Sequence, residues 1–299
     1  MAKARQIVKR RKAVTNIRKI TRTMQLIATA RFQQAFNRAM GTKPYTEKIT
    51  QLVEELSAAA KDQVDHPLLQ SNPQSRKDLL LVVTSNRGLC GGYNGSVLRT
   101  ALGHLDKTAD REHELHVVGK KGIAYFRFLG RQVEKAIADI DDRPRFDQVE
   151  PIAAEYMRRY EAGEVGEVHV AYMRFLSTSR QVPVVVRLLP LSAEEKPPPA
   201  AEGAAVKTVE PKLSVQYDFS PLPVELLKVL LPQTVKVRLF QCFMDAAVSE
   251  QTSRMVAMKA ATDAASDMIK LLSRQFNRAR QTQITLELLD IVGGAEALK

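Results

Sequence analysis

The sequence contains a very long stretch without a helix-breaking residue near its C-terminus. Residues 233–292 hold neither proline nor glycine. Their apolar side chains recur every three or four residues, which is the spacing of one helix face. A sixty-residue helix is about 90 Å long, whereas a compact chain of this size is roughly 50 Å across. The helix is therefore expected to extend beyond any globular part, and to end at a cap formed by Gly293 and Gly294. The apolar positions are Phe240, Phe243, Ala247, Met255, Met258, Ala261, Ala265, Met268, Leu272, Phe276 and Ala279.

The N-terminal segment has the length and the pattern to pair with this helix. Residues 3–58 are predicted to be helical, with a kink or short break at Gly41 and Pro44 and an end near His66. The simplest arrangement is a long antiparallel coiled coil of the N- and C-terminal helices. Because the N-terminal spacing is nearer 3.6 than 3.5 residues, we expect little or irregular supercoiling. The predicted N-terminal seam is Ile17, Ile20, Met24, Ala28, Phe32, Ala35 and Ala39.

The middle of the chain changes to the pattern of an α/β domain. Short apolar runs at residues 79–84, 115–118, 168–172 and 184–188 are typical of buried strands. Helical stretches separate them, which indicates a mostly parallel sheet in a Rossmann-like domain inserted between the long helices. We therefore predict an N-terminal coiled-coil helix (1–66), a central α/β domain (67–212) and a foot segment with the C-terminal helix (213–299). A proline-rich linker occupies residues 190–212.

The positive charge is concentrated at the start of the chain. The formal net charge is +12, from 45 basic and 33 acidic residues. Residues 1–46 hold twelve of the basic residues and no acid, so the remaining chain is balanced. A concentrated cationic field implies an anionic partner, which is nucleic acid, a lipid surface or an acidic protein face. The basic residues are Lys3, Arg5, Lys9, Arg10, Arg11, Lys12, Arg18, Lys19, Arg22, Arg31, Arg38 and Lys43.

No catalytic, cofactor or metal site is predicted from the residues. The turn at residues 84–95 is rich in glycine and follows a strand, but its spacing fits neither known phosphate-binding pattern, so a structural turn is favoured over a nucleotide site. Five scattered histidines lack ligand-like spacing. Cys90 and Cys242 are far apart, which predicts free thiols in a reducing compartment. No apolar stretch is long enough to predict a transmembrane span.

Four segments, in order along nearly the whole chain, resemble the sequence signatures of one protein family. Residues 20–28 (ITRTMQLIA) are similar to its N-terminal signature, and residues 85–92 (SNRGLCGG) to its glycine-rich turn. Residues 247–263 (AVSEQTSRMVAMKAATD) and 277–295 (NRARQTQITLELLDIVGGA) resemble two highly specific C-terminal motifs. The family that these segments resemble is the gamma subunit of F-type, proton-driven ATP synthases. The resemblance implies a central rotor shaft with no active site of its own, in a complex at the cytoplasmic face of the bacterial inner membrane.

The resemblance also implies partners and contact residues. The coiled coil would stand inside a ring of three alpha and three beta subunits, and the foot would bind the epsilon subunit and the ring of c subunits. Arg18, Lys19, Arg22 and Met24 would face acidic loops of beta. A second set would make polar contacts with beta; its members are Arg254, Arg280, Gln281, Thr285 and Glu287.

The foot and the turn depart from the family pattern at one residue each. Tyr217 and Asp218 match the foot contact, but Ser220 stands where the family usually has glutamate, so Asp218 is expected to substitute for it. Asn86 stands where the turn usually has aspartate, which questions any role of that charge.

Two other functions are compatible with parts of the sequence. A nucleic-acid-binding coiled coil would use the basic N-terminal segment, but it would predict further basic patches or interleaved aromatic residues. A small nucleotide-dependent α/β enzyme would explain the middle of the chain, yet it has no matching motif and no need of the long helices. Copurification with alpha and beta subunits or with nucleic acid separates these functions.

Overall fold

The computed structural model describes residues 2–59, 66–72, 75, 77–191 and 223–296. The chain divides into two compact units. The first combines Met1–Ala30 with Arg254–Lys299, and the second comprises Arg31–Ser253. Two long helices, α1 (Ala2–Ala59) and α5 (Pro223–Glu296), contribute to both units.

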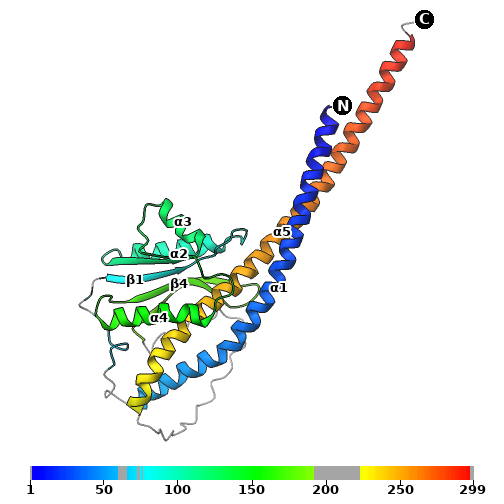
Figure 1. Cartoon of the computed structure of the whole chain (residues 1–299). Coiled ribbons are helices and arrows are strands. Elements are labelled where there is room, and N and C mark those ends of the chain that lie inside the picture. Colours follow the sequence, from blue (N-terminus) through cyan, green and yellow to red (C-terminus); the bar gives the residue numbers. More distant parts are fainter. Residues whose placement is uncertain (1, 60–65, 73–74, 76, 192–222, 297–299) are drawn as a thin grey trace. The chain divides into compact units, whose positions relative to one another are not determined.

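The second unit is built on a five-stranded sheet with the order β3-β2-β1-β4-β5 (Figure 1). β1 is parallel to both β2 and β4, β2 is parallel to β3, and β5 is antiparallel to β4. The predicted α/β domain with a mostly parallel sheet is confirmed. The short edge strand β3 was not predicted, because three residues, of which only Ile137 is buried, are too few to show a period. The strands are β1 (Lys77–Val83), β2 (Glu112–Val118), β3 (Lys135–Ile137), β4 (Val168–Phe175) and β5 (Gln181–Leu189).

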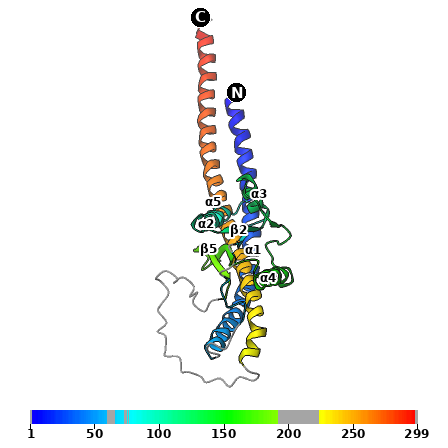
Figure 2. The same ribbon diagram turned by 90° about the vertical axis from the view of Figure 1, so that its left-hand side faces the viewer.

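Helices cover both faces of this sheet because its central strand is apolar on both sides. Leu80 and Val82 of β1 point into a core shared with α2 (Tyr93–Lys107) and α3 (Lys120–Phe128). The alternate residues of β1 point into a second core with α4 (Phe146–Glu161). Segments of α1 and α5 also pack into that second core. Figures 1 and 2 both draw the start of α5 beside α4.

The first unit is an antiparallel pair formed by the start of α1 and the end of α5. Arg11 lies over the ring of Phe276, with 5.5 Å between its guanidinium carbon and the ring centroid. Ten residues further along α1, Thr21 Oγ1 accepts a hydrogen bond from Thr262 Oγ1 of α5 at 2.9 Å. Residue numbers increase along α1 while those of the contacting residues on α5 decrease, so the two helices run in opposite directions. This confirms the predicted coiled coil of the two terminal helices.

The seam of this pair repeats every seven residues, which corrects the predicted spacing. Val14 and Ala28 are buried on α1, with Thr21 half-buried midway between them. Ile17 and Ile20 were predicted in the seam, but they are 52% and 59% exposed. A seven-residue repeat keeps one narrow stripe against the partner helix, whereas the 3.6-residue pattern drifts out of contact. The matching stripe on α5 is Met258, Ala265 and Leu272.

Both long helices continue through residues that were predicted to interrupt them. α1 has no break at Gly41 or Pro44, because buried neighbours on both sides, such as Ala39 and Ile49, hold it against its surroundings. The described part of α1 ends at Ala59, before His66.

The ends of α5 also differ from the prediction. The helix includes Pro232, with Leu227 and Leu231 fully buried around it. It passes through Gly293 and Gly294 to Glu296. A glycine cap requires a positive φ angle, and neither glycine is among the residues that have one. The predicted C-cap is therefore wrong.

Candidate functional site

The start of α1 presents an exposed surface that is both cationic and apolar. Lys19 and Arg22 are exposed, and Arg18 and Met24 are half-buried. Within the described part of the chain, no ion pair joins these cations to an acid. Ile20 is exposed beside them. The structure thus brings together the first set of predicted contact residues on one helix and leaves their charges unneutralised.

The end of α5 extends past the point where α1 begins, as Figure 1 shows for this unit. Arg280, Gln281, Thr285 and Glu287 are all exposed there. Thr285 Oγ1 donates to the carbonyl of Gln281 at 3.0 Å, which is a local bond within the helix. The structure therefore places these four predicted contact residues together on the surface.

Large apolar residues are exposed on the same helical segment. Their exposed fractions range from 45% for Ile284 to 67% for Ile291. A soluble surface rarely leaves so many large apolar side chains together without a partner. The segment therefore has the composition of a protein-binding surface. The exposed apolar residues are Ile284, Leu286, Leu288, Leu289, Ile291 and Val292.

The remaining predicted contact residues are not on this surface. Arg254 is 7% exposed and interacts within the chain. Tyr217 and Asp218 lie outside the described residues, as does Ser220. The apolar positions predicted on α5 are divided: Met258 is buried, whereas Met268 is 43% exposed.

The glycine-rich turn is filled by its own hydrogen bonds. Asn94 Oδ1 accepts the backbone N–H of Ser85 at 3.0 Å, and Ser85 Oγ donates to the carbonyl of Arg87 at 2.6 Å. Cys90 is buried against Asn94 Nδ2, 3.2 Å from its sulfur. A cavity beside the turn measures about 20 Å³, whereas ligand pockets measure about 300–1,000 Å³. The turn therefore fits the structural role that the sequence favoured.

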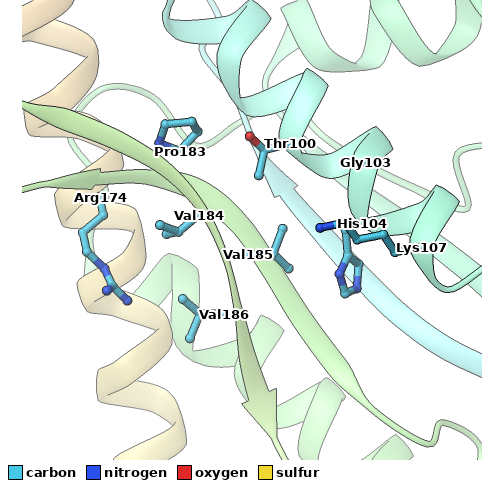
Figure 3. Close-up of a pocket in the computed structure, with 9 residues that line it drawn as sticks. All are labelled: Thr100, Gly103, His104, Lys107, Arg174, Pro183, Val184, Val185 and Val186. Carbon is cyan, nitrogen blue, oxygen red and sulfur yellow. The ribbon is translucent and has the colours of Figure 1, made fainter. Parts of the chain in front are cut away.

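A larger groove of 390 Å³ follows the edge strand β5 (Figure 3). Thr100, His104 and Lys107 of α2 line one side of it, and Arg174 of β4 lines another. The valines of β5 lie between Arg174 and α2 in this view. Since the cationic side chains do not converge on one point, the groove does not form an anion-binding site.

Three of the histidines that are scattered in sequence meet on one side of the sheet. The rings of His104 and His169 are 4.6 Å apart, and those of His104 and His113 are 6.3 Å apart. The sequence could not reveal this cluster, because its members come from α2, β4 and β2. Among the described residues, no group of acidic, histidine and cysteine side chains has the arrangement to hold a metal ion. Cys90 and Cys242 are both buried and free, as predicted.

This histidine cluster should make the second unit sensitive to acid. Burial, followed by the charges of His104 and Arg187, lowers the pKa of His169 to about 3. In the unfolded chain this histidine takes up a proton near pH 6.5, whereas in the folded chain it stays neutral down to about pH 3. Keeping His169 neutral therefore costs no stability above pH 6.5, and the free energy of unfolding decreases as pH falls from 6.5 toward 3. We expect the free energy of unfolding of His169→Gln to decrease less on acidification than that of the wild type, by up to about 1.4 kcal/mol for each pH unit.

Urea unfolding of both proteins between pH 5 and 7.5 measures this difference. Above pH 7 the difference in free energy of unfolding between the two proteins should stay constant, which is the internal control. A gap that stays constant from pH 7 down to pH 5 would show that His169 is not held neutral by the fold.

Comparison with known proteins places the chain in one family. A family model described as ATP synthase matches residues 3–298. The ATP synthase gamma chain of Rhodopirellula baltica is 46% identical over 304 residues, covering 100% of both chains. That of Saccharopolyspora erythraea is 39% identical over 314 residues, covering 100% of this chain and 98% of its own.

Solved structures share the fold at low sequence identity. A chain of the Euglena gracilis mitochondrial ATP synthase (OSCP/F1/c-ring) has a TM-score of 0.65 at 16% identity, covering 99% of this chain and 95% of its own. A chain of the rotor of the same enzyme has a TM-score of 0.63 at 17% identity, covering 95% of this chain and 99% of its own. The family match along nearly the whole length, with identities well above 30%, shows that this chain belongs to the ATP synthase gamma chain family.

Proposed function

We propose that this chain is the central rotor shaft of an F-type ATP synthase. It couples proton flow through a membrane ring of c subunits to ATP synthesis in a ring of alpha and beta subunits, and the complex requires it for assembly and regulation. The observation that carries this proposal is the end of α5, where large apolar residues and polar contact residues are exposed on a helix that extends past its partner. Membership of the gamma chain family supports the same function.

The proposed contacts with alpha and beta follow the exposed surfaces of the first unit. The cations Lys19 and Arg22, with Arg18 and Met24 beside them, face acidic loops of beta. Gln281 and Thr285 contact beta near the end of α5, and the apolar residues around them sit in a seat formed by alpha and beta. Individually, exposed ion pairs contribute about 0–1 kcal/mol, so many weak contacts permit rotation where a few strong ones would lock it. Arg254 would have to leave its buried position to take part.

The chain itself has no active site in this proposal, and the catalytic sites belong to its partners. The glycine-rich turn supports this, because its polar groups are hydrogen-bonded to one another. The foot, including Tyr217 and Asp218, contacts the epsilon subunit and the c ring.

We place the complex at the cytoplasmic face of a bacterial inner membrane, with this chain as a peripheral component. Along the described helices, none is both long enough and apolar enough to cross a membrane.

Reconstitution tests the proposed function. The chain is mixed with alpha and beta subunits of a related bacterial enzyme, and the complex is purified through beta. A complex that contains this chain and hydrolyses ATP supports the shaft function. Failure of the chain to copurify would contradict it, and binding of nucleic acid by the chain in place of alpha and beta would favour the nucleic-acid-binding alternative.

Removing the two polar contact groups at the end of α5 should weaken coupling. For Gln281→Ala with Thr285→Val, we expect lower ATP synthesis or less complex, by about tenfold if both hydrogen bonds to beta are lost, because each contributes about 0.5–1.5 kcal/mol. ATP binding to the complex should not change. The matched control is Gln275→Ala with Thr282→Val, two exposed residues on the same helix.

ATP synthesis by the assembled complex in vesicles and nucleotide binding are measured on the same preparations. If coupled synthesis is as fast in the double variant as in the control, Gln281 and Thr285 do not contact beta.

A further inference from the structure

The loop between β3 and α4, residues 138–145, is fixed to the sheet by one amide side chain. Asn86 donates from Nδ2 to the carbonyl of Ile140 at 2.9 Å and to Asp141 Oδ1 at 3.1 Å. Its Oδ1 accepts the backbone N–H of Lys120 at 3.0 Å. A carboxylate at position 86 would have no hydrogen to give these acceptors and would repel Asp141. The asparagine therefore suits this loop, and it positions the residues that follow.

Asp142 joins this loop to both long helices. Its Oδ2 accepts Arg31 Nη1 from α1 and Gln251 Nε2 from α5, the latter at 3.0 Å. The next residue, Arg143, donates to Gln34 Oε1 at 2.9 Å, close to one turn along α1 from Arg31. Gln251 is 1% exposed and the Asp142 side chain 18%, so solvent and salt screen these bonds less than surface pairs. We call Arg31, Asp142 and Gln251 the Asp142 clasp.

The start of α4 adds two contacts to the same side of α5. Phe146 meets Phe240 edge to face with 5.6 Å between ring centroids, and Lys236 Nζ lies 2.7 Å from Glu150 Oε1. Positions 236, 240 and 251 are four and eleven residues apart, which places them on one face of a helix. A turn of α5 about its axis by one residue, about 100°, would break these contacts together.

Directional bonds resist such a turn better than the apolar contacts nearby. Phe175 of β4 packs on Phe32 and Phe36 of α1, with ring centroids 6.3 and 5.9 Å apart. Apolar packing is non-directional and resists separation, whereas charge-assisted hydrogen bonds weaken steeply when their angle changes. We propose that the Asp142 clasp is the torsional lock that transmits torque between the long helices and the α/β domain. This inference rests on the proposed function as a rotor shaft.

The test compares two aspartate variants in the assembled enzyme. Asp142→Ala removes the clasp, and Asp147→Ala removes an exposed carboxylate at the start of α4, which is 67% exposed and pairs with Arg145. Each complete complex in vesicles is assayed for ATP hydrolysis and for ATP-driven proton pumping. We expect Asp142→Ala to hydrolyse ATP while pumping fewer protons per ATP, and Asp147→Ala to keep the wild-type ratio.

Amide exchange gives a second readout of the clasp. In Asp142→Ala, exchange in residues 138–145 should become about tenfold faster, since a hydrogen bond to a charged group changes an equilibrium by at least that order. A charge swap, Arg31→Asp with Asp142→Arg, should restore the pumping ratio. In the swap, Gln251 Oε1 can accept a hydrogen bond from the arginine introduced at position 142. In the wild type this oxygen lacks a hydrogen-bond partner in the described part of the chain.

Different failures separate this inference from the proposed function. If Asp142→Ala pumps as many protons per ATP as Asp147→Ala, the clasp transmits no torque. If the swap pumps as few protons per ATP as Asp142→Ala, the carboxylate–guanidinium bond is not the lock. A wild-type chain that neither assembles nor pumps would overturn the proposed function itself.

Discussion

Replacing Ala265 by proline is expected to break α5 within the first unit and to abolish assembly with alpha and beta subunits. Ala265 is 7% exposed and shares a small core with Val14 and Leu272. Proline removes a backbone hydrogen bond and clashes with the preceding turn, which costs about 3 kcal/mol or more. A two-helix pair with so small a core cannot offset that loss.

Circular dichroism at 222 nm and limited digestion with trypsin measure the break, because Lys270 and Arg274 follow the substituted position. Digestion at these residues should be much faster in Ala265→Pro. The control is Ala265→Ser, which keeps the helix and nearly the same volume. Wild-type helicity and normal assembly in the proline variant would show that the seam does not depend on a continuous α5.

Replacing Gly119 by valine is expected to destabilise the second unit strongly and to lower its melting temperature. Gly119 follows β2 with a φ of 92°, and a Cβ there would lie 2.3 Å from the carbonyl oxygen of Thr84. A β-branched residue is a genuine outlier at positive φ, and the oxygen it meets is backbone that cannot move aside. Backbone strain and overpacking each cost about 1–3 kcal/mol, so the combined loss is about 2–6 kcal/mol.

Thermal unfolding followed by circular dichroism checks this prediction. Gly103→Ala is the matched control, because Gly103 lies within α2 and an added Cβ would meet nothing within 4 Å. Alanine there should stabilise the unit by about 0.5–1 kcal/mol through its better helix propensity. Equal melting temperatures for Gly119→Val and the wild type would mean that β2 does not end as described.

The sequence predicts the existence of the long helices and of the sheet, but not the details that depend on contacts across the chain. A sixty-residue stretch without proline or glycine leaves few structures other than a helix. Ala28, Ala35 and Ala39 are buried as the seam prediction required, whereas Ile17 and Ile20 are exposed. These two were misplaced because they fit a helical period as well as Val14 does, and only the facing residues on α5 decide between them.

The residues of the clasp illustrate why the rest of the site could not be predicted. Arg31, Asp142 and Gln251 are more than a hundred residues apart from one another and belong to no local motif. Asn86 looked like a departure that removes a charge, but the structure uses its N–H donors to hold a loop. The exposed polar residues at the end of α5 were predicted as contact residues only because the family resemblance singled them out.

Rotation of the chain inside its complex tests the shaft function most directly. A cysteine introduced at exposed Thr178 provides an attachment point for a bead, since Cys90 and Cys242 are buried. With alpha and beta subunits fixed to a surface, addition of ATP should make the bead turn in one direction about a fixed axis. A complex that hydrolyses ATP while the bead only fluctuates about one position would contradict the account.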